Sequence, residues 1–156
     1  MGTAIGPVFD YLNANLPAAL LAVNANVGFN DGWAGEIVDD MFFMGRTDPN
    51  QGEAEAGAMA YLELGAQRVT EEFDIPFFID SWRGGSDQSE SRNAALLLFD
   101  AFVAFLRTDL TLGGALHAGR YAQISSTTMV QTPDAESAKN GRRCLIFFRV
   151  TCKNIY

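Results

Sequence analysis

The stretch that decides the fold covers residues 90–116 and reads ESRNAALLLFDAFVAFLRTDLTLGGAL. Every residue over 94–106 is apolar except Asp100, and Leu112-Gly113-Gly114 interrupts the pattern. Asp87 and Glu90 form a capping box before the run, so we predict a helix over 87–107. A helix this apolar needs cover on more than one side. Its own sheet provides one cover, and either the rest of a small domain or a neighbouring subunit provides the other.

The chain beyond this helix predicts a long C-terminal hairpin. Apolar and polar residues alternate over 142–153, which is typical of a strand, and its partner is a predicted strand over 115–128. A polar loop over 130–141 joins them. Cys144 and Cys152 lie on the second strand, about 26 Å apart at ~3.3 Å per residue. A disulfide needs Cα atoms closer than about 7 Å, so we expect two buried thiols.

The chain before this helix predicts one further helix and several strands. Helical spacing of apolar residues favours a helix over 3–16, capped by Thr3 and ended or bent by Pro17. Residues 23–35 favour a loop with at most a short strand, and 37–44 a strand. The segment 45–57 is a polar loop. Strands over 59–64 and 67–82 follow, joined through Gly65-Ala66.

The strand over 67–82 has two different faces. Glu71 falls on the side of Phe73 and Phe77, whereas Glu72 and Asp74 fall on the side that alternation assigns to solvent. Pro76 indicates an edge strand or a bulge. The resulting prediction is a single α+β domain over 1–156, with an antiparallel or mixed sheet and two main helices packed on it.

The charge distribution of the chain is uneven. The net charge is −8, and 48% of the residues are hydrophobic, which is enough for a folded core. Residues 1–136 carry −13 and residues 137–156 carry +5, which sums to −8. An acidic body is unsuited to tight phosphate binding. The asymmetry suits head-to-tail self-association, although solubility alone also explains it.

No residues with catalytic or metal-binding spacing stand out. His117 is the one histidine, and no CxxC, P-loop or nucleophile motif is present. Glu72, Asp74 and the pair Asp39-Asp40 are expected to lie on a solvated or lumen-facing surface. The most apolar run is shorter than the roughly 20 residues of a membrane span. We expect a soluble protein that is made in a cytoplasm and is not an enzyme. We also expect that it binds no cofactor, metal or membrane.

The order of these elements resembles tail terminator (tail-completion) proteins of long-tailed bacteriophages. The resemblance extends over nearly the whole chain, through TEEFDIPFFI (70–79), the stretch 90–116 and the closing RRCLIFFRVTCKNIY (142–156). Its most specific part is the helix followed by 109–114, which in this family ends the helix and enters a strand.

The resemblance implies a homohexameric ring in the virion, at the junction of head and tail. Such a ring caps the tail tube, stops its polymerisation and joins it to the head–tail connector protein, and DNA passes through without specific binding. Glu72 and Asp74 are then candidates to face the lumen. Candidates to contact the tail tube protein, the connector or the next subunit come from the polar loops and the basic end: Arg46, Asp48, Glu53, Glu55, Asp134, Glu136, Lys139, Arg142 and Arg143.

Three alternatives remain open at this point. A head-completion or neck protein and a tail-tube subunit both form rings too. A small enzyme that uses the carboxylates of 71–74 belongs to a different class, and it requires a closed pocket around them.

Overall fold

The computed structural model describes residues 3–32, 37–45, 61–65, 68–117, 119–133 and 141–155. The strands in these residues form one mixed sheet in the order β1-β2-β4-β6-β5, and β3 pairs with the start of β4. β1 is parallel to β2, and the other pairs are antiparallel. The predicted α+β class is confirmed. The elements are α1 (Ile5–Val23), β1 (Gly28–Asp31), β2 (Asp40–Met44), β3 (Tyr61–Gly65), β4 (Arg68–Arg83), α2 (Gln88–Thr108), β5 (Ala122–Pro133) and β6 (Arg142–Ile155).

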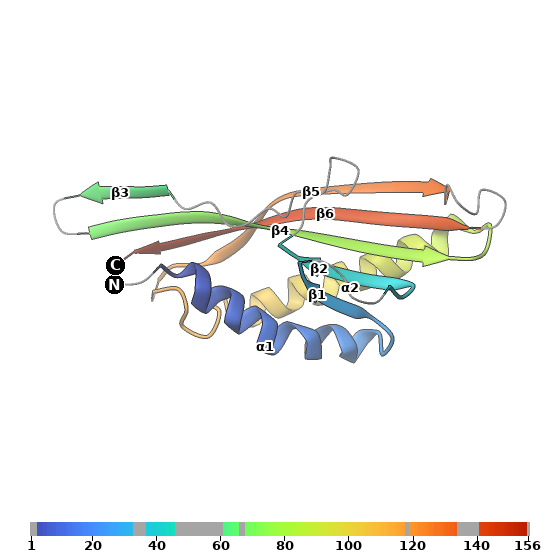
Figure 1. Ribbon diagram of the computed structural model, residues 1–156, viewed down its shortest axis with the longest axis horizontal. Helices are drawn as coiled ribbons and strands as arrows, with labels where there is room; N and C mark the ends of the chain where they lie inside the picture. Colours follow the sequence, from blue (N-terminus) through green and yellow to red (C-terminus); the bar gives the residue numbers. More distant parts are fainter. Residues whose placement is uncertain are drawn as a thin grey trace.

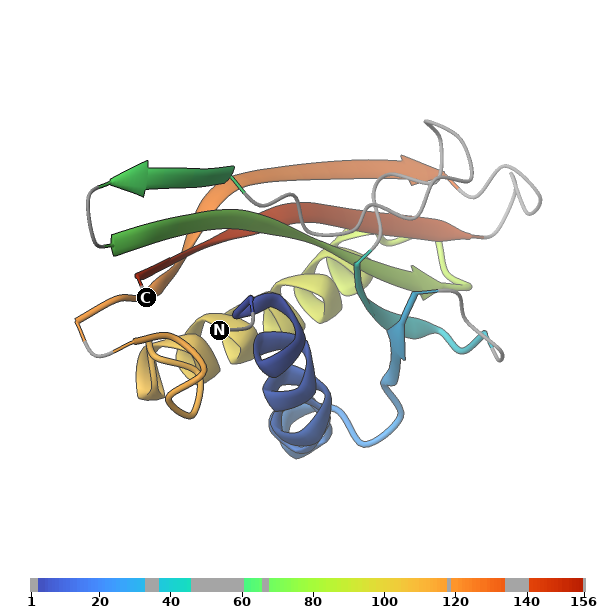
Figure 2. The same ribbon diagram turned by 60° about the vertical axis from the view of Figure 1, so that its left-hand side comes forward.

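Both helices lie on one face of the sheet, and the main core lies between the two layers (Figures 1 and 2). Phe148 of β6 is at its centre. Its ring centroid is 5.1 Å from that of Phe77, 5.0 Å from that of Phe102 and 6.0 Å from that of Phe42. The apolar run of α2 therefore faces β4 and β6, as the sequence predicted.

A second, smaller cluster lies on the opposite face of the sheet. Phe78 stacks on Phe43 at 5.3 Å between ring centroids, and Met41 and Leu145 are buried beside them. Alternation along β4 puts Phe78 on the same face as Glu72 and Asp74, the face that was expected to be solvated. That expectation is wrong at Phe78, which is buried. The sheet is thus apolar on both faces where β2, β4 and β6 run side by side.

α1 continues to Val23, so the predicted end of this helix before Pro17 is wrong. Pro17 removes a backbone hydrogen bond, at a cost of about 3 kcal/mol in a helix interior. Burial of Leu20, one turn beyond the proline, offsets this cost because it extends the buried stripe of the helix. The stripe consists of Val8, Leu12, Leu16 and Leu20.

The start of α1 is held by Glu71, a fully buried carboxylate of β4. The backbone N–H of Ala4 donates to Glu71 Oε2 at 2.9 Å, and the Thr3 hydroxyl donates to Glu71 Oε1. A carboxylate suits a helix N-terminus because its N–H groups are free there. Thr3 also accepts a bond from the N–H of Ile5 at 3.2 Å. The N-cap residue is Ala4, which makes no side-chain capping bond, so the predicted cap at Thr3 is wrong by one position. Thr3 and Glu71 instead accept bonds from the N–H groups of Ile5 and Ala4.

Pro76 lies in a strand with neighbours on both sides, so the predicted edge position is wrong for β4 as a whole. The carbonyl of Pro76 accepts a bond from the N–H of Gly45 at 2.8 Å. The nitrogen and carbonyl of one strand residue point to the same side. The ring nitrogen therefore points away from β6. It lies between the start of β3, where Tyr61 pairs with Glu72, and the end of β2, where Met44 pairs with Phe77. No bond to β6 is lost.

Asp109 organises the turn after α2. Its carboxylate accepts bonds from the N–H groups of Thr111 at 2.9 Å and Gly113 at 2.7 Å. Leu112 is buried and has a φ of 53°, and a Cβ on Gly113 would lie 2.5 Å from the Tyr11 ring. The helix stop predicted here is confirmed. The predicted strand start at Ala115 is wrong, because this turn delays β5 until Ala122.

The hairpin of β5 and β6 is confirmed, and β5 extends further than expected. It pairs with β6 from Ala122 to Pro133, with an irregularity between Ile124 and Ser126. Cys144 and Cys152 are both free and buried, as predicted. Burial raises the pKa of the Cys152 thiol to about 12. In the part of the chain described, no helix is long and apolar enough to cross a membrane.

Candidate assembly surfaces

The helix-free face of the sheet carries the two acidic residues that were expected to line a lumen. Glu72 Oε2 lies 3.2 Å from Lys153 Nζ, and Asp74 accepts a 2.5 Å bond from the Thr151 hydroxyl. Both carboxylates lie on the face that alternation predicted. Lys153 neutralises one of them, so this face is less acidic than the count of carboxylates indicates.

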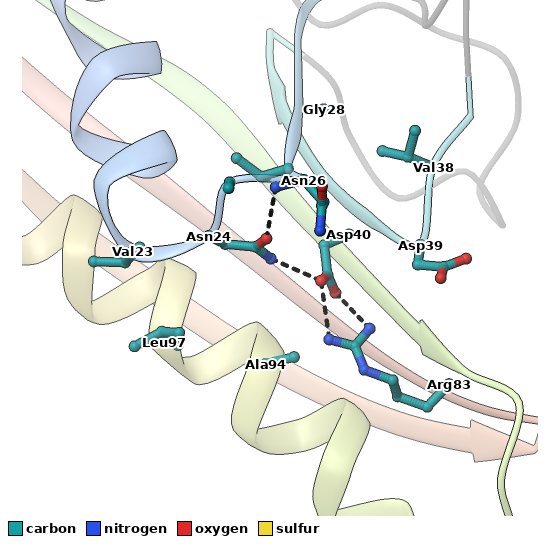
Figure 3. A pocket seen from close by; sticks show the side chains of 12 residues that line it. Val23, Asn24, Asn26, Gly28, Val38, Asp39, Asp40, Arg83, Ala94 and Leu97 are labelled. Atoms are coloured by element: carbon teal, nitrogen blue, oxygen red, sulfur yellow. Dashed lines mark hydrogen bonds and ion pairs between the residues drawn. The ribbon is translucent and has the colours of Figure 1, made fainter.

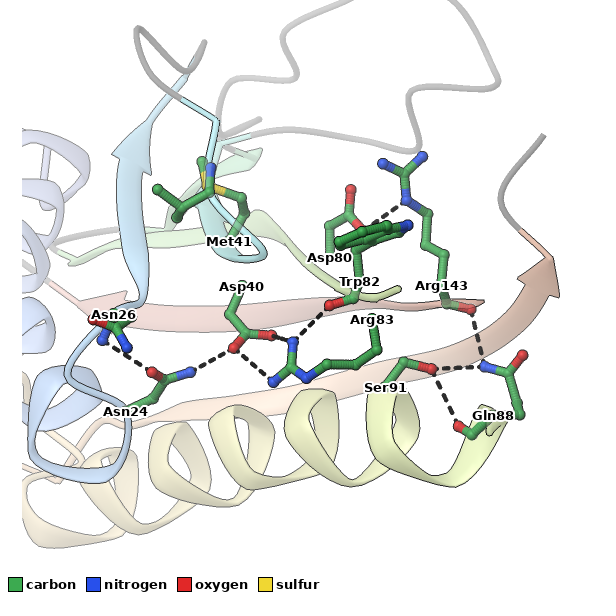
Figure 4. Close-up of polar contacts among 11 residues, drawn as sticks. Asn24, Asn26, Asp40, Met41, Asp80, Trp82, Arg83, Gln88, Ser91 and Arg143 are labelled. Carbon is green, nitrogen blue, oxygen red and sulfur yellow. Dashed lines mark hydrogen bonds and ion pairs between the residues drawn. The ribbon is translucent and has the colours of Figure 1, made fainter. Parts of the chain in front are cut away.

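The basic end of the chain is partly neutralised within the fold. Arg143 Nε lies 3.1 Å from Asp80 Oδ1 on the neighbouring strand (Figure 4). Arg142 donates to the Gly141 carbonyl at 2.9 Å. Because β6 pairs along all of β4, bases of the C-terminal segment meet acids of the body inside one molecule. Fewer basic side chains of the C-terminal segment are therefore available to bind acidic groups of a neighbouring subunit. The other interface candidates lie outside the described residues: Arg46, Asp48, Glu53, Glu55, Asp134, Glu136 and Lys139.

A groove of about 980 Å³ lies beside the β1 edge, between the end of α1 and the first half of α2 (Figure 3). Exposed aliphatic side chains gather at it: Val23 and Val38 line it, and Leu97 is 46% exposed. Leu21 and Ile37, which precede two of its lining segments, are also exposed. The groove therefore presents apolar surface to solvent. Its lining residues are Val23, Asn24, Ala25, Asn26, Val27, Gly28, Val38, Asp39, Asp40, Arg83, Ala94 and Leu97.

An ion pair between the buried Asp40 and the partly exposed Arg83 lies in this groove. Both terminal nitrogens of Arg83 donate to Asp40, at 2.9 Å each, and Asn24 Nδ2 donates to Asp40 Oδ2 at 2.7 Å (Figures 3 and 4). Burial alone would raise the pKa of Asp40. The bonds from Arg83 and Asn24 outweigh it, so the pKa lies below the usual 3.8. The expectation that Asp40 is solvated is wrong; its neighbour Asp39 is exposed as expected.

Among the described strands, β5 lies at one end of the sheet and is widely exposed. Every residue over 125–131 is exposed, including Thr127 and Met129, which face the helix layer because they pair with the inward-facing Phe148 and Ile146. Met129 is 43% exposed. The helix layer therefore does not cover this strand. β5 also has no charged residue, the usual protection of a free strand edge.

The residues that carried the enzyme alternative do not converge. Glu71 lies on the helix side of the sheet and caps α1, whereas Glu72 and Asp74 lie on the other side. His117 is exposed, and its backbone N–H donates to Asn154 Oδ1 at 2.7 Å. Among the described residues no three His, Cys, Asp or Glu side chains are grouped to hold a metal ion.

Sequence reasoning missed both surfaces. For the groove no local signal existed, because Asn24, Asp40 and Arg83 lie far apart in the chain and only the pairing of β2 with β4 joins two of them. For β5 a signal was present. Residues 121–133 contain no charge, in a chain with 19% charged residues, and this composition is what an edge strand normally avoids.

Among known proteins, similarity is found to solved structures and not to sequences. No family model and no curated protein matches the sequence. A solved chain from a structure described as "Virion of native gene transfer agent (GTA) particle" is similar over 94% of this chain and 92% of that one. It has 12% sequence identity and a TM-score of 0.39.

Proposed function

We propose that the protein is a structural virion subunit that acts by stoichiometric binding and catalyses no reaction. The observation that carries the proposal is β5, an uncharged edge strand that is exposed along seven consecutive residues. A long, open strand edge is a template for pairing with another chain, and monomeric proteins protect such edges. In a subunit that assembles, the open edge is available to pair with another chain.

Within this class we propose a tail terminator, a ring of six copies that caps the tail tube and joins it to the head connector. The support is the order of elements, in which α2, the Asp109 turn and the closing hairpin follow one another as in that family. The tail tube protein and the connector are the proposed partners, and the groove at the β1 edge, with its exposed aliphatic side chains, is a second open surface for such contacts.

The charge of the chain fits a passage for DNA. Six copies at −8 carry 6 × −8 = −48. Asp74 and the partly neutralised Glu72 lie on the helix-free face, which we propose faces the lumen. Like charge keeps DNA from binding tightly to the wall, because affinity for phosphates requires cationic groups.

Electron microscopy of particles that contain the protein tests this function. We expect a six-fold ring at the head–tail junction in which the chain fits the density. Density that repeats along the whole tail would make the protein a tube subunit instead, and a ring within the portal region would make it a neck protein. Absence from purified particles would contradict every structural role.

A further inference from the structure

Two open surfaces, each with exposed aliphatic side chains among polar ones, lie at opposite ends of the strand order. The groove adjoins β1 and β2, at one end of the strand order, and β5 forms the other end. The two sides of α2 face these two surfaces. Ala94 and Leu97 line the groove, whereas Arg92 and Leu96, four residues apart and therefore on one side of the helix, fall on the opposite side of its buried stripe.

The helix-facing side of β5 is open to a partner, because the helix layer does not cover it. Thr127 and Met129 project toward the helix layer and are exposed, and Leu96 of α2 is exposed as well. We call this set, with Arg92, the β5 face. Three of its four residues are uncharged, and the fourth is a cation.

Charge argues that the partner is another copy of this chain. Two copies at −8 repel each other unless they meet through surfaces that are poor in carboxylates. The β5 face has none. Most of the groove lining is uncharged, and Asp40 is already paired with Arg83, which leaves Asp39 as the exposed acid there. A cation on one surface and an acid on the other are complementary.

We propose that the β5 face of one copy binds the groove of a second copy. The proposal rests on the proposed function, for which it names the contact between subunits. Met129 and Leu96 then cover the aliphatic side chains at the groove, and Arg92 approaches Asp39. Because the two surfaces differ, each bound copy leaves one of them free, so the contact builds a closed ring or an open chain and not an isolated dimer.

Two single substitutions and their mixture test this contact. Met129→Glu places a carboxylate in the β5 face, and Leu97→Glu places one in the groove. Leu110→Glu is the matched control, because Leu110 is 46% exposed and lies on neither surface. Sedimentation velocity of each purified protein, at concentrations up to about 1 mM, a range that reports weak association, measures self-association.

We expect the wild type and Leu110→Glu to form species of two or more copies. Each of the other variants should associate at least about 100-fold more weakly, because an unpaired carboxylate is buried in the contact. An equimolar mixture of the two should restore dimers and nothing larger, since only the β5 face of Leu97→Glu and the groove of Met129→Glu remain intact. Val23→Glu replaces Leu97→Glu if the latter does not fold.

Three results would overturn the proposal: a wild type that stays monomeric at about 1 mM, variants that associate as well as Leu110→Glu, or a mixture without dimers. These outcomes are independent of the proposed function. A protein absent from virions can still associate through these faces, and a protein at the head–tail junction can fail to do so.

Discussion

β6 has two neighbours in the sheet, β4 and β5, and these two strands differ in burial and in charge. β4 lies inside the sheet with the helices on one face, and two of its carboxylates meet bases of β6, in the pairs Asp80–Arg143 and Glu72–Lys153. β5 carries no charge and is exposed on both faces over 125–131. The comparison indicates a division of tasks in one sheet: β4 stabilises the monomer, and β5 is available for a partner.

Removal of the ring of Phe148 is the strongest way to break this comparison on the side of the fold. Phe148 is buried where four aromatic rings meet it, so Phe148→Ala should lower the free energy of unfolding by about 4 kcal/mol. Met129→Ala in β5 should change it by about 0.5 kcal/mol or less, because its side chain is exposed. Urea denaturation measures both. Similar losses for the two would mean that β5 belongs to the core.

Arg83 tests whether the groove is built into the fold. Arg83→Met leaves Asp40 buried without its cation and should cost about 2–3 kcal/mol. Arg107→Met is the control, since Arg107 is exposed in the last turn of α2 and contributes only about 0.5 kcal/mol through the helix dipole. Equal denaturation midpoints for the two variants would show that the ion pair does not stabilise the protein.

Acid should weaken the same pair. The pKa of Asp40 lies below 3.8 in the folded protein, so its contribution to stability is fully present above the unfolded value and is lost as pH falls through the folded pKa. Asp40→Asn should therefore lose less stability than the wild type between about pH 5 and pH 2. Asp87 and Asp109, whose pKa values are also lowered, are unchanged in the variant. Parallel pH profiles of the midpoint would refute this role of Asp40.

Lys153 should give the smallest effect. Both side chains of its ion pair with Glu72 are more than 40% exposed to solvent. Lys153→Met should therefore change the free energy of unfolding by less than about 0.5 kcal/mol. Urea denaturation at low and at 1 M salt checks this. A loss near that of Arg83→Met would mean that the helix-free face contributes to the fold as much as the groove does.

The sequence was sufficient where periodicity and turn chemistry act locally. The apolar pattern of α2, the helix stop at Leu112-Gly113-Gly114, the Asp87 cap and the alternation of β6 all predicted the observed elements. The class, a sheet with two helices on it, follows from these. The short β1 was allowed for, but its parallel pairing with β2 is a tertiary choice that no local pattern encodes.

The errors arise where distant residues decide. Pro17 is tolerated because Leu20 is buried beyond it, and Pro76 because β2 and β3 leave its nitrogen side open. Asp40 appeared solvated because its partner Arg83 is 43 residues away. Contacts between residues far apart in the sequence therefore explain both the two tolerated prolines and the ion pair in the groove.

The most direct test of the proposed role of β5 in ring assembly is electron microscopy of tails. The tails are assembled with Met129→Glu as the only form of the protein, and with Leu110→Glu as the control. We expect tails of uncontrolled length without a terminal ring for Met129→Glu, and capped tails of uniform length for Leu110→Glu. Capped tails of uniform length with Met129→Glu would contradict it.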